Sequence, residues 1–242
     1  MTPKTADSSL LAWQQGVLGR AVIAAETRLL AGAMDDVFGL ELLQVGVWGT
    51  GRELVSGSRT RHQSVICSGA AFNGDADLAA NPAMLPVATG SVDAMLLPHT
   101  LEIAPDPQAV LREADRVLLG QGHLVVLGFR PLSLWGLRSA ASHSGFPPGF
   151  TRLIAERRLL DWLILLGYEI TLARHYLYFV PTESGARAGL QGRGALRRGL
   201  FNPLPAGAYL LKARKRTYTL TPIRLRRRER APLIGRLVNP TI

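Results

Sequence analysis

Three glycines in one short turn, Gly46, Gly49 and Gly51, are the first residues whose spacing indicates chemistry. They follow the apolar run Leu42–Val45, which is brief enough to be a buried strand. Glycine lets a backbone approach a ligand closely, and the N-terminus of a helix after such a turn favours negative charge. The turn therefore indicates a cofactor loop. An ordinary strand-to-helix turn is the alternative, because the G-x-x-G-x-G spacing differs from the G-x-G-x-x-G of dinucleotide-binding proteins.

His99 and Glu102 follow a second strand candidate, Val92–Leu97, which runs into Pro98. In an open parallel sheet, ligands bind at the carboxyl ends of the strands, so both residues are expected at the edge that carries the glycine turn. An imidazole with a pKa near 6.5 suits a general base, and Glu102 could orient a substrate donor. The alternative interpretation has His99 bonded to a backbone carbonyl and Glu102 facing solvent. Asp93, at the start of the strand, is interpreted as a structural acid.

Strands and helices alternate along the chain to position these residues. A helix is expected from Ser9 to about Phe38, and its glycines allow two shorter helices instead. Further helices are expected from Pro107 to Gly120, with Asp106 as the N-cap, and from Thr151 to about Leu166. The other expected strands are Gln63–Cys67, His123–Phe129, Tyr168–Val180 and Ala208–Ala213.

This alternation predicts an α/β fold with a mostly parallel sheet that is covered by helices on both faces. Residues 181–207 are rich in Gly and Pro, so no helix is expected there, and the last two strands are predicted to pair antiparallel at an edge. We predict one domain over residues 1–216, of which 1–39 form an N-terminal helical segment. Residues 217–242 are predicted to be a flexible basic tail.

Most of the positive charge lies in the last quarter of the chain. The net charge is +10, but residues 187–242 carry fourteen Lys and Arg against one acidic residue, Glu229. The preceding part is slightly acidic, and a hydrophobic content of 47% suffices for a full core. A basic segment neutralises phosphates, so residues 212–230 could contact nucleic acid without sequence specificity. Contact with anionic lipid and a solvated tail are the alternatives.

Cysteine and histidine are too sparse for a metal or disulfide framework. Cys67 is the single cysteine, which excludes an intramolecular disulfide and a Cys-rich zinc site, and the five histidines are scattered, so no metal site is expected. No secretory signal and no long uncharged stretch is evident, so a transmembrane segment is not expected and the cytoplasm is the expected location.

The run from Leu85 to Phe129 reads LPVATGSVDAMLLPHTLEIAPDPQAVLREADRVLLGQGHLVVLGF. It resembles the core of class I S-adenosylmethionine (SAM) dependent methyltransferases of the type 11 group. In that family an LP-x-x-x-x-S-[FV]-D segment leads into the fourth strand, and an LEH-x-x-DP turn, an LREVxRVLxPGG helix and the fifth strand follow. The segments GFRPLSLWGLR, LLDWLILLGYEI and AYLLKARKR (128–138, 159–170 and 208–216) are similar to the YafS-like bacterial methyltransferases.

The resemblance implies a Rossmann-like, mostly parallel seven-stranded sheet with an antiparallel edge strand, and it implies SAM as the cofactor. Gln44 stands where the family usually carries an acid, and the second strand ends without the family's ribose-binding acid. The side-chain carbonyl of Asn81 could accept a hydrogen bond from the adenine amine. The residues that the resemblance assigns to cofactor binding are Gln44, Gly46, Gly49, Gly51, Asn81, Met84 and Pro98.

The resemblance also implies a reaction, namely methyl transfer from SAM to an acceptor. A small molecule is favoured slightly over RNA, and His99 and Glu102 are the candidate catalytic residues. Residues 130–148 would form a lid or substrate wall, or simply a loop that covers the end of the sheet. The alternative function is a catalytically degenerate protein of the same fold that binds nucleic acid or a partner through its basic C-terminal segment. The two missing acids support that alternative.

Overall fold

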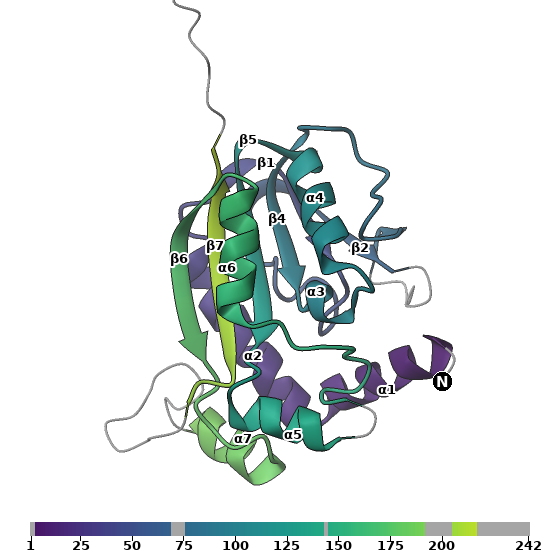
Figure 1. The fold of residues 1–242 in the computed structure, drawn as a ribbon, viewed down its shortest axis with the longest axis vertical. Helices are drawn as coiled ribbons and strands as arrows, with labels where there is room; N and C mark the ends of the chain where they lie inside the picture. The colour runs from purple at the N-terminus through teal and green to yellow at the C-terminus, as the bar shows by residue number, and fades with distance from the viewer. Residues whose placement is uncertain (1–2, 69–75, 143–144, 192–204, 217–242) are drawn as a thin grey trace, which may run out of the picture.

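The computed structural model describes residues 3–68, 76–142, 145–191 and 205–216 (Figure 1). The predicted tail, residues 217–242, lies outside the described residues. The strands are β1 (Phe38–Val45), β2 (Arg59–Cys67), β3 (Leu78–Ala79), β4 (Val92–Pro98), β5 (Leu118–Phe129), β6 (Tyr168–Tyr176) and β7 (Ala208–Lys215). The helices are α1 (Pro3–Gln15), α2 (Val17–Ala33), α3 (Thr100–Ile103), α4 (Pro107–Val117), α5 (Leu134–Ala141), α6 (Glu156–Leu165) and α7 (Glu183–Gln191).

The strands form one seven-stranded sheet in the order β3-β2-β1-β4-β5-β7-β6. β1 pairs in parallel with β2 and with β4, and β4 pairs in parallel with β5. β7 enters between β5 and β6 and is antiparallel to both. The prediction of a mostly parallel Rossmann-like sheet with an antiparallel edge is therefore confirmed, and β1 and β4 lie at its centre.

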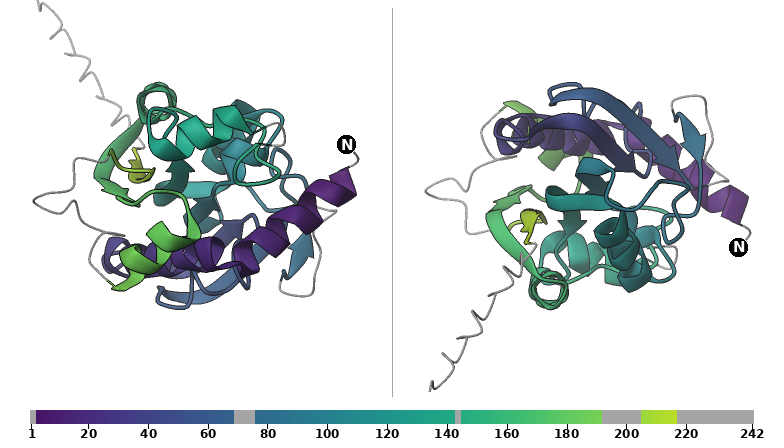
Figure 2. Two further views of the ribbon diagram at one scale, coloured as in Figure 1. Left: turned by 90° about the horizontal axis from the view of Figure 1, so that it is seen from below. Right: turned by 90° about the horizontal axis from the view of Figure 1, so that it is seen from above.

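Helices cover both faces of the sheet because alternate strand residues are apolar on both sides. On one face, α2 packs through Val22 and Leu30 against Leu42 of β1 and Leu96 of β4. On the other face, α4 and α6 pack against neighbouring strand residues such as Leu43. Figure 2 shows α2 and α7 on one side of the sheet and α6 on the other. The carboxyl ends of the parallel strands therefore lie at the edge of the sheet, between the helices of the two faces.

The N-terminal helical segment consists of two helices, which is the alternative that its glycines allowed. Gly16 has extended backbone angles between α1 and α2, and a Cβ on Gly19 would lie 2.3 Å from the carbonyl oxygen of Trp13. The expected end near Phe38 was wrong, since α2 ends at Ala33. The buried Lys212 of β7 explains this end, because its ammonium donates hydrogen bonds to the Ala33 carbonyl and the Asp36 carboxylate.

The expected helix after the glycine turn is absent. Residues 46–58 form turns that lead directly into β2. Four glycines and two serines in thirteen residues disfavour a helix, whose first turn is costly to nucleate. Leu54 and Val55 still anchor this segment in the core. A ligand at this turn would therefore meet backbone groups of the turn itself and not the N-terminus of a helix.

Later elements follow the predictions with two corrections. Asp106 caps α4 as expected, and its carboxylate accepts hydrogen bonds from the amides of Gln108 and Ala109. Thr151 does not cap α6, which begins only at Glu156, because its hydroxyl donates to the Glu102 carbonyl instead. Residues 181–207 do contain a helix, α7. In the part of the chain that the structure describes, no helix is both long and apolar enough to cross a membrane.

Candidate cofactor and catalytic site

The carboxyl ends of β1 and β4 lie side by side, so the glycine turn adjoins the loop after β4. Gln44 of β1 is opposite Leu96 of β4 in the parallel register. The hydroxyl of Thr100, which begins α3 in the segment after β4, donates a hydrogen bond to the carbonyl of Val45. This bond ties the two loops together at the edge where open α/β sheets bind their ligands.

All three glycines of the turn have backbone angles that other residues rarely adopt. The φ angles are +105° at Gly46, +67° at Gly49 and +86° at Gly51. A Cβ at Gly46 would also lie only 2.7 Å from Oγ1 of Thr100. Gly46 is therefore required both by its backbone conformation and by the close approach of the β4 loop.

Gln44 lies fully buried just before this turn and has an unused acceptor. Its Nε2 donates a hydrogen bond of 2.9 Å to the Gly46 carbonyl, whereas its Oε1 has no partner among the described residues. A buried polar atom without a partner costs about 1–3 kcal/mol. A ligand that donates a hydrogen bond at the glycine turn would remove that cost, so the residues present fit a cofactor with polar hydrogens.

The other predicted cofactor residues follow β3 or stand at the end of β4. Asn81 and Met84 follow β3, and the Asn81 side-chain oxygen accepts from the Ala83 amide at 2.9 Å. Met84 is 75% exposed, so it is open to a ligand, whereas Pro98 is buried at the end of β4. Among the described residues, no hydrogen bond joins Asn81 or Met84 to the glycine turn, so their role as cofactor residues stays a prediction.

His99 lies enclosed between two carboxylates. Its Nδ1 is 2.8 Å from Oε2 of Glu102, and its Nε2 is 2.8 Å from Oε1 of Glu26. The histidine has a left-handed φ of +56° and is fully buried. Glu102 is also buried, and its other oxygen accepts a hydrogen bond of 2.8 Å from the Phe129 amide.

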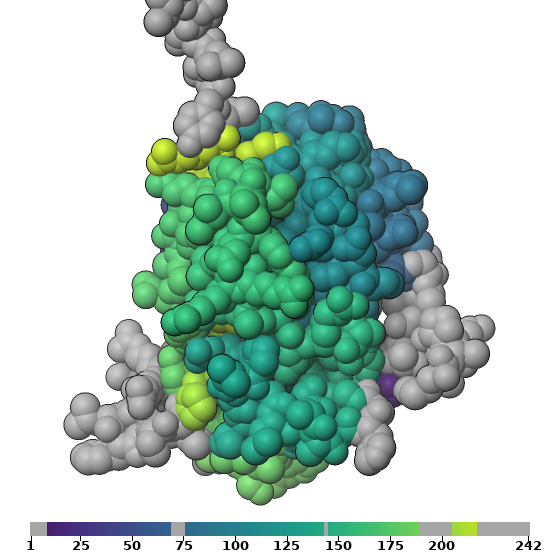
Figure 3. All heavy atoms as spheres, in the orientation of Figure 1, coloured from purple at the N-terminus to yellow at the C-terminus, as the bar shows by residue number. Residues whose placement is uncertain are grey.

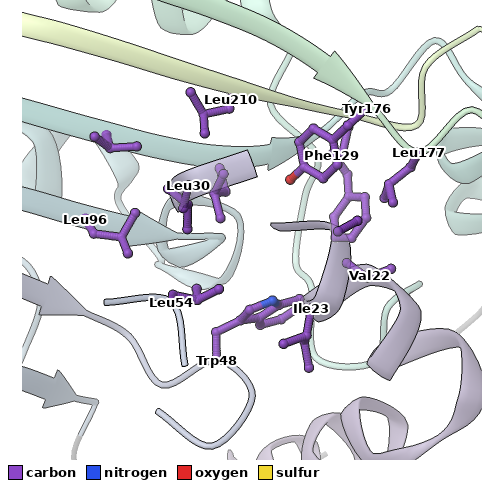
Figure 4. Packing of buried hydrophobic residues seen from close by; sticks show 14 of the residues in the cluster. Val22, Ile23, Leu30, Trp48, Leu54, Leu96, Phe129, Tyr176, Leu177 and Leu210 are labelled. Carbon is purple, nitrogen blue, oxygen red and sulfur yellow. The ribbon is translucent and has the colours of Figure 1, made fainter. Parts of the chain in front are cut away.

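Glu26 is the residue that joins these groups into one cluster. Besides His99, its Oε1 accepts from the Tyr176 hydroxyl at 2.8 Å, and its Oε2 accepts from the Trp48 indole at 2.5 Å. Glu26 therefore connects α2, the glycine turn, the β4 loop and β6. We refer to Glu26, Trp48, His99, Glu102 and Tyr176 as the buried cluster. In Figure 4 the Trp48 ring lies against Ile23 of α2, with Tyr176 in the same packed region.

The two carboxylates determine the charge of His99. Burial alone would lower its pKa, but the charges of Glu26 and Glu102 and their hydrogen bonds outweigh burial and raise the pKa to about 9. Burial raises the pKa of Glu102, and the hydrogen bond from His99 opposes that rise. Burial and the charge of Glu26 raise the pKa of the Tyr176 phenol well above its usual value. At neutral pH the imidazole is therefore protonated and donates from both nitrogens.

The raised pKa of His99 predicts how stability depends on pH. The protonated form is favoured in the folded state, so the stabilisation is complete below about pH 6.5 and is lost as pH rises through 9. A shift from 6.5 to about 9 corresponds to roughly 3 kcal/mol. Glu102, whose pKa is also raised, changes stability in the same direction. Urea unfolding between pH 6.5 and 9.5 should show this decline, and a flat or rising profile would contradict it.

Aromatic rings enclose the histidine from both sides. The ring centroid of His99 lies 4.5 Å from that of Trp48 and 4.4 Å from that of Phe129. Phe129 in turn stacks on Trp135 of the segment 130–148, which was expected to be a lid or a cover. Trp135 is buried, so this segment packs onto the end of the sheet. Leu132 and Leu137 of the same segment are exposed.

Glu26 and Tyr176 are the members of the buried cluster that the sequence did not indicate. One signal for Glu26 exists, because it lies four residues after Val22 and four before Leu30, on the buried face of α2. An acid on an apolar helix face needs a buried partner. Tyr176 gave no such signal.

The chain is similar in sequence to known proteins over part of its length. Residues 56–126 match the family described as "Methyltransferase domain". The chain is also 36% identical over 166 residues to "Uncharacterized protein YafS" of Escherichia coli strain K12, which is 67% of this chain and 64% of YafS. The chain therefore resembles a methyltransferase domain over these residues, and it spans less than two thirds of the length of YafS.

Solved structures agree with this fold. A SAM-dependent methyltransferase of Thermotoga maritima, described as a possible histamine N-methyltransferase, has a TM-score of 0.64 at 19% identity and covers 85% of this chain and 94% of its own. The [4+2]-cyclase SpnF has a TM-score of 0.55 at 23% identity and covers 79% and 80%. Because a cyclase shares the fold, the fold alone does not define the reaction, which depends on the residues of the site.

Proposed function

We propose that this protein is a methyltransferase that binds SAM at the glycine turn after β1 and transfers its methyl group to an acceptor. The observation that carries the proposal is the unused Gln44 acceptor beside three positive-φ glycines at the centre of a methyltransferase-fold sheet. SAM supplies a methyl group activated by a sulfonium. The names of the structural relatives, which include SAM-dependent enzymes, support SAM as the cofactor.

The chain's own residues would bind the cofactor without the usual acids. Gln44 offers a neutral acceptor, the backbone of Gly46–Gly51 allows close approach, and Pro98 bounds the site from β4. We propose that Asn81 and Met84 contact the adenine. Because the ribose and its neighbours would lack charge-assisted hydrogen bonds, we expect weak binding, since each such bond contributes about 1.5–3 kcal/mol.

We propose that His99 and Glu102 serve the reaction from within the buried cluster. Both side chains are fully enclosed, and the imidazole is held by two carboxylates. The general-base role of His99 stays a prediction, and it requires the cluster to open so that His99 loses its proton and reaches the acceptor. In the closed arrangement, the cluster holds the glycine turn against α2 and the β4 loop.

A small acceptor is the better proposal than RNA. The carboxyl edge is lined by packed aromatic rings, which suits an enclosed apolar substrate. The basic run at the end of β7 is less available to nucleic acid than its sequence indicated, because Lys212 is buried and Lys215 donates to the Asp115 carbonyl. The rest of the segment 212–230 beyond residue 216 lies outside the described residues.

Replacing Gln44 by leucine should weaken SAM binding roughly tenfold, because a cofactor donor would lose its acceptor. Leucine has a similar volume, so the fold should remain. Isothermal titration with SAM checks this, and Gln15→Leu on the exposed face of α1 is the matched control. An unchanged affinity of Gln44→Leu, with folding verified by urea unfolding, would refute the assigned role of Gln44.

A further inference from the structure

A second polar cleft lies on the α4 and α6 face of the sheet, apart from the glycine turn. It has a volume of about 320 Å³ and lies between the start of α4, the start of α6 and Pro131 after β5. Figure 3 shows this face, with α6 in green beside α4 in teal. The size is that of a pocket for a small ligand. Neither the proposed cofactor site nor the buried cluster contributes a side chain to it.

Two arginines, Arg152 and Arg158, line this cleft. Arg152 donates a hydrogen bond of 2.9 Å to the Pro105 carbonyl, and the Arg158 guanidinium lies 5.0 Å from the centre of the Trp162 ring. Among the described residues, no carboxylate lies within 4.0 Å of either guanidinium. The two side chains are oriented by a carbonyl and by an aromatic ring, and no carboxylate of the described residues pairs with their positive charges.

The nearby acids are occupied by other contacts. The carboxylate of Asp106 caps α4 and lies 3.6 Å from Arg112, so its charge is partly neutralised. Glu156, in the first turn of α6, bonds His175 at 2.7 Å. The cleft therefore has a net positive character that its own acids do not cancel.

We propose that this cleft binds a small molecule through a phosphate group held between Arg152 and Arg158. A guanidinium presents a planar fork of donors that matches a phosphate in two parallel hydrogen bonds. The cleft is concave and limited in size, which suits a single phosphorylated metabolite better than an extended polymer. The ligand would lie near the reaction edge, because the Arg152 amide also donates to the Glu102 carbonyl at 3.4 Å.

Titration of the full chain with inorganic phosphate at low, constant ionic strength tests this proposal. We expect saturable binding in the millimolar range and a loss of about tenfold or more in affinity in Arg152→Gln and in Arg158→Gln, since each removes a charge-assisted bond. Arg158→Lys keeps the charge but not the fork, so it should be intermediate. The matched control is Arg157→Gln, which changes an exposed neighbour outside the cleft and should alter affinity less than about twofold.

A failure of the phosphate cleft can be distinguished from a failure of the proposed SAM site. If phosphate does not bind, the proposal is overturned. It is also overturned if Arg157→Gln weakens binding as much as Arg158→Gln, because phosphate would then respond to the overall positive charge of this surface and not to the cleft. SAM affinity measured on the same variants should be unchanged. Both arginines are exposed, so the variants should fold, and urea unfolding verifies this before titration.

Discussion

Replacing Glu26 by alanine should lower the free energy of unfolding by roughly 3–5 kcal/mol, because it leaves buried polar partners without their acceptor. His99 would keep only Glu102, and the Tyr176 hydroxyl and the Trp48 indole would lose their bonds. This is a large part of the stability of an ordinary domain. Urea unfolding at pH 7 measures the effect.

Two companion variants make this result specific. Asp35→Ala removes an exposed carboxylate that pairs with Arg59 at 3.3 Å, and it should cost less than about 1 kcal/mol. Glu26→Gln keeps the shape and one acceptor, so it should be intermediate and should make the decline of stability above pH 6.5 shallower. If Glu26→Ala costs no more than Asp35→Ala, the buried cluster does not hold the edge of the sheet.

Replacing Gly46 by alanine should abolish measurable SAM binding. The new Cβ would meet Oγ1 of Thr100 at 2.7 Å, and alanine is strained at a φ of +105°, so the turn must shift. Strain of this kind costs about 1–3 kcal/mol of stability, which the fold should survive. A displacement of the turn also moves the side chain of Gln44, because its Nε2 donates a hydrogen bond to the Gly46 carbonyl.

Gly32→Ala is the matched control for that variant. Gly32 lies exposed in α2 with nothing within 4 Å of a Cβ, so alanine should raise stability by up to about 1 kcal/mol and leave SAM affinity unchanged. Calorimetric titration of both variants with SAM measures the two affinities. Normal SAM affinity in Gly46→Ala would place the cofactor away from the turn.

Local patterns in the sequence predicted the centre of this fold well. The unit from β4 through α4 to β5 combines a buried strand, an Asp-Pro helix start and a second apolar strand, and each of these signals acts over a few residues. The turn of positive-φ glycines was predicted on the same basis. The helix that should have followed it was not formed, because the glycines and serines that make the turn continue to residue 58.

Contacts between distant residues account for what the sequence could not predict. Lys212 ends α2 from the other end of the chain, a separation of 179 residues from Ala33. His99 was singled out by its position after β4, but its two carboxylate partners place it inside the core, and Glu26 is 73 residues away. Only the arrangement of α2 against the sheet brings these groups together.

Binding of SAM to the unmodified chain tests the central claim most directly. Calorimetric titration of folded protein with SAM, and with S-adenosylhomocysteine as the product form, should give a saturable signal with one site. Affinity should be modest, since Gln44 replaces a charged acceptor. If well-folded protein gives no heat with either ligand at millimolar concentration, the claim that the glycine turn is a SAM site is wrong.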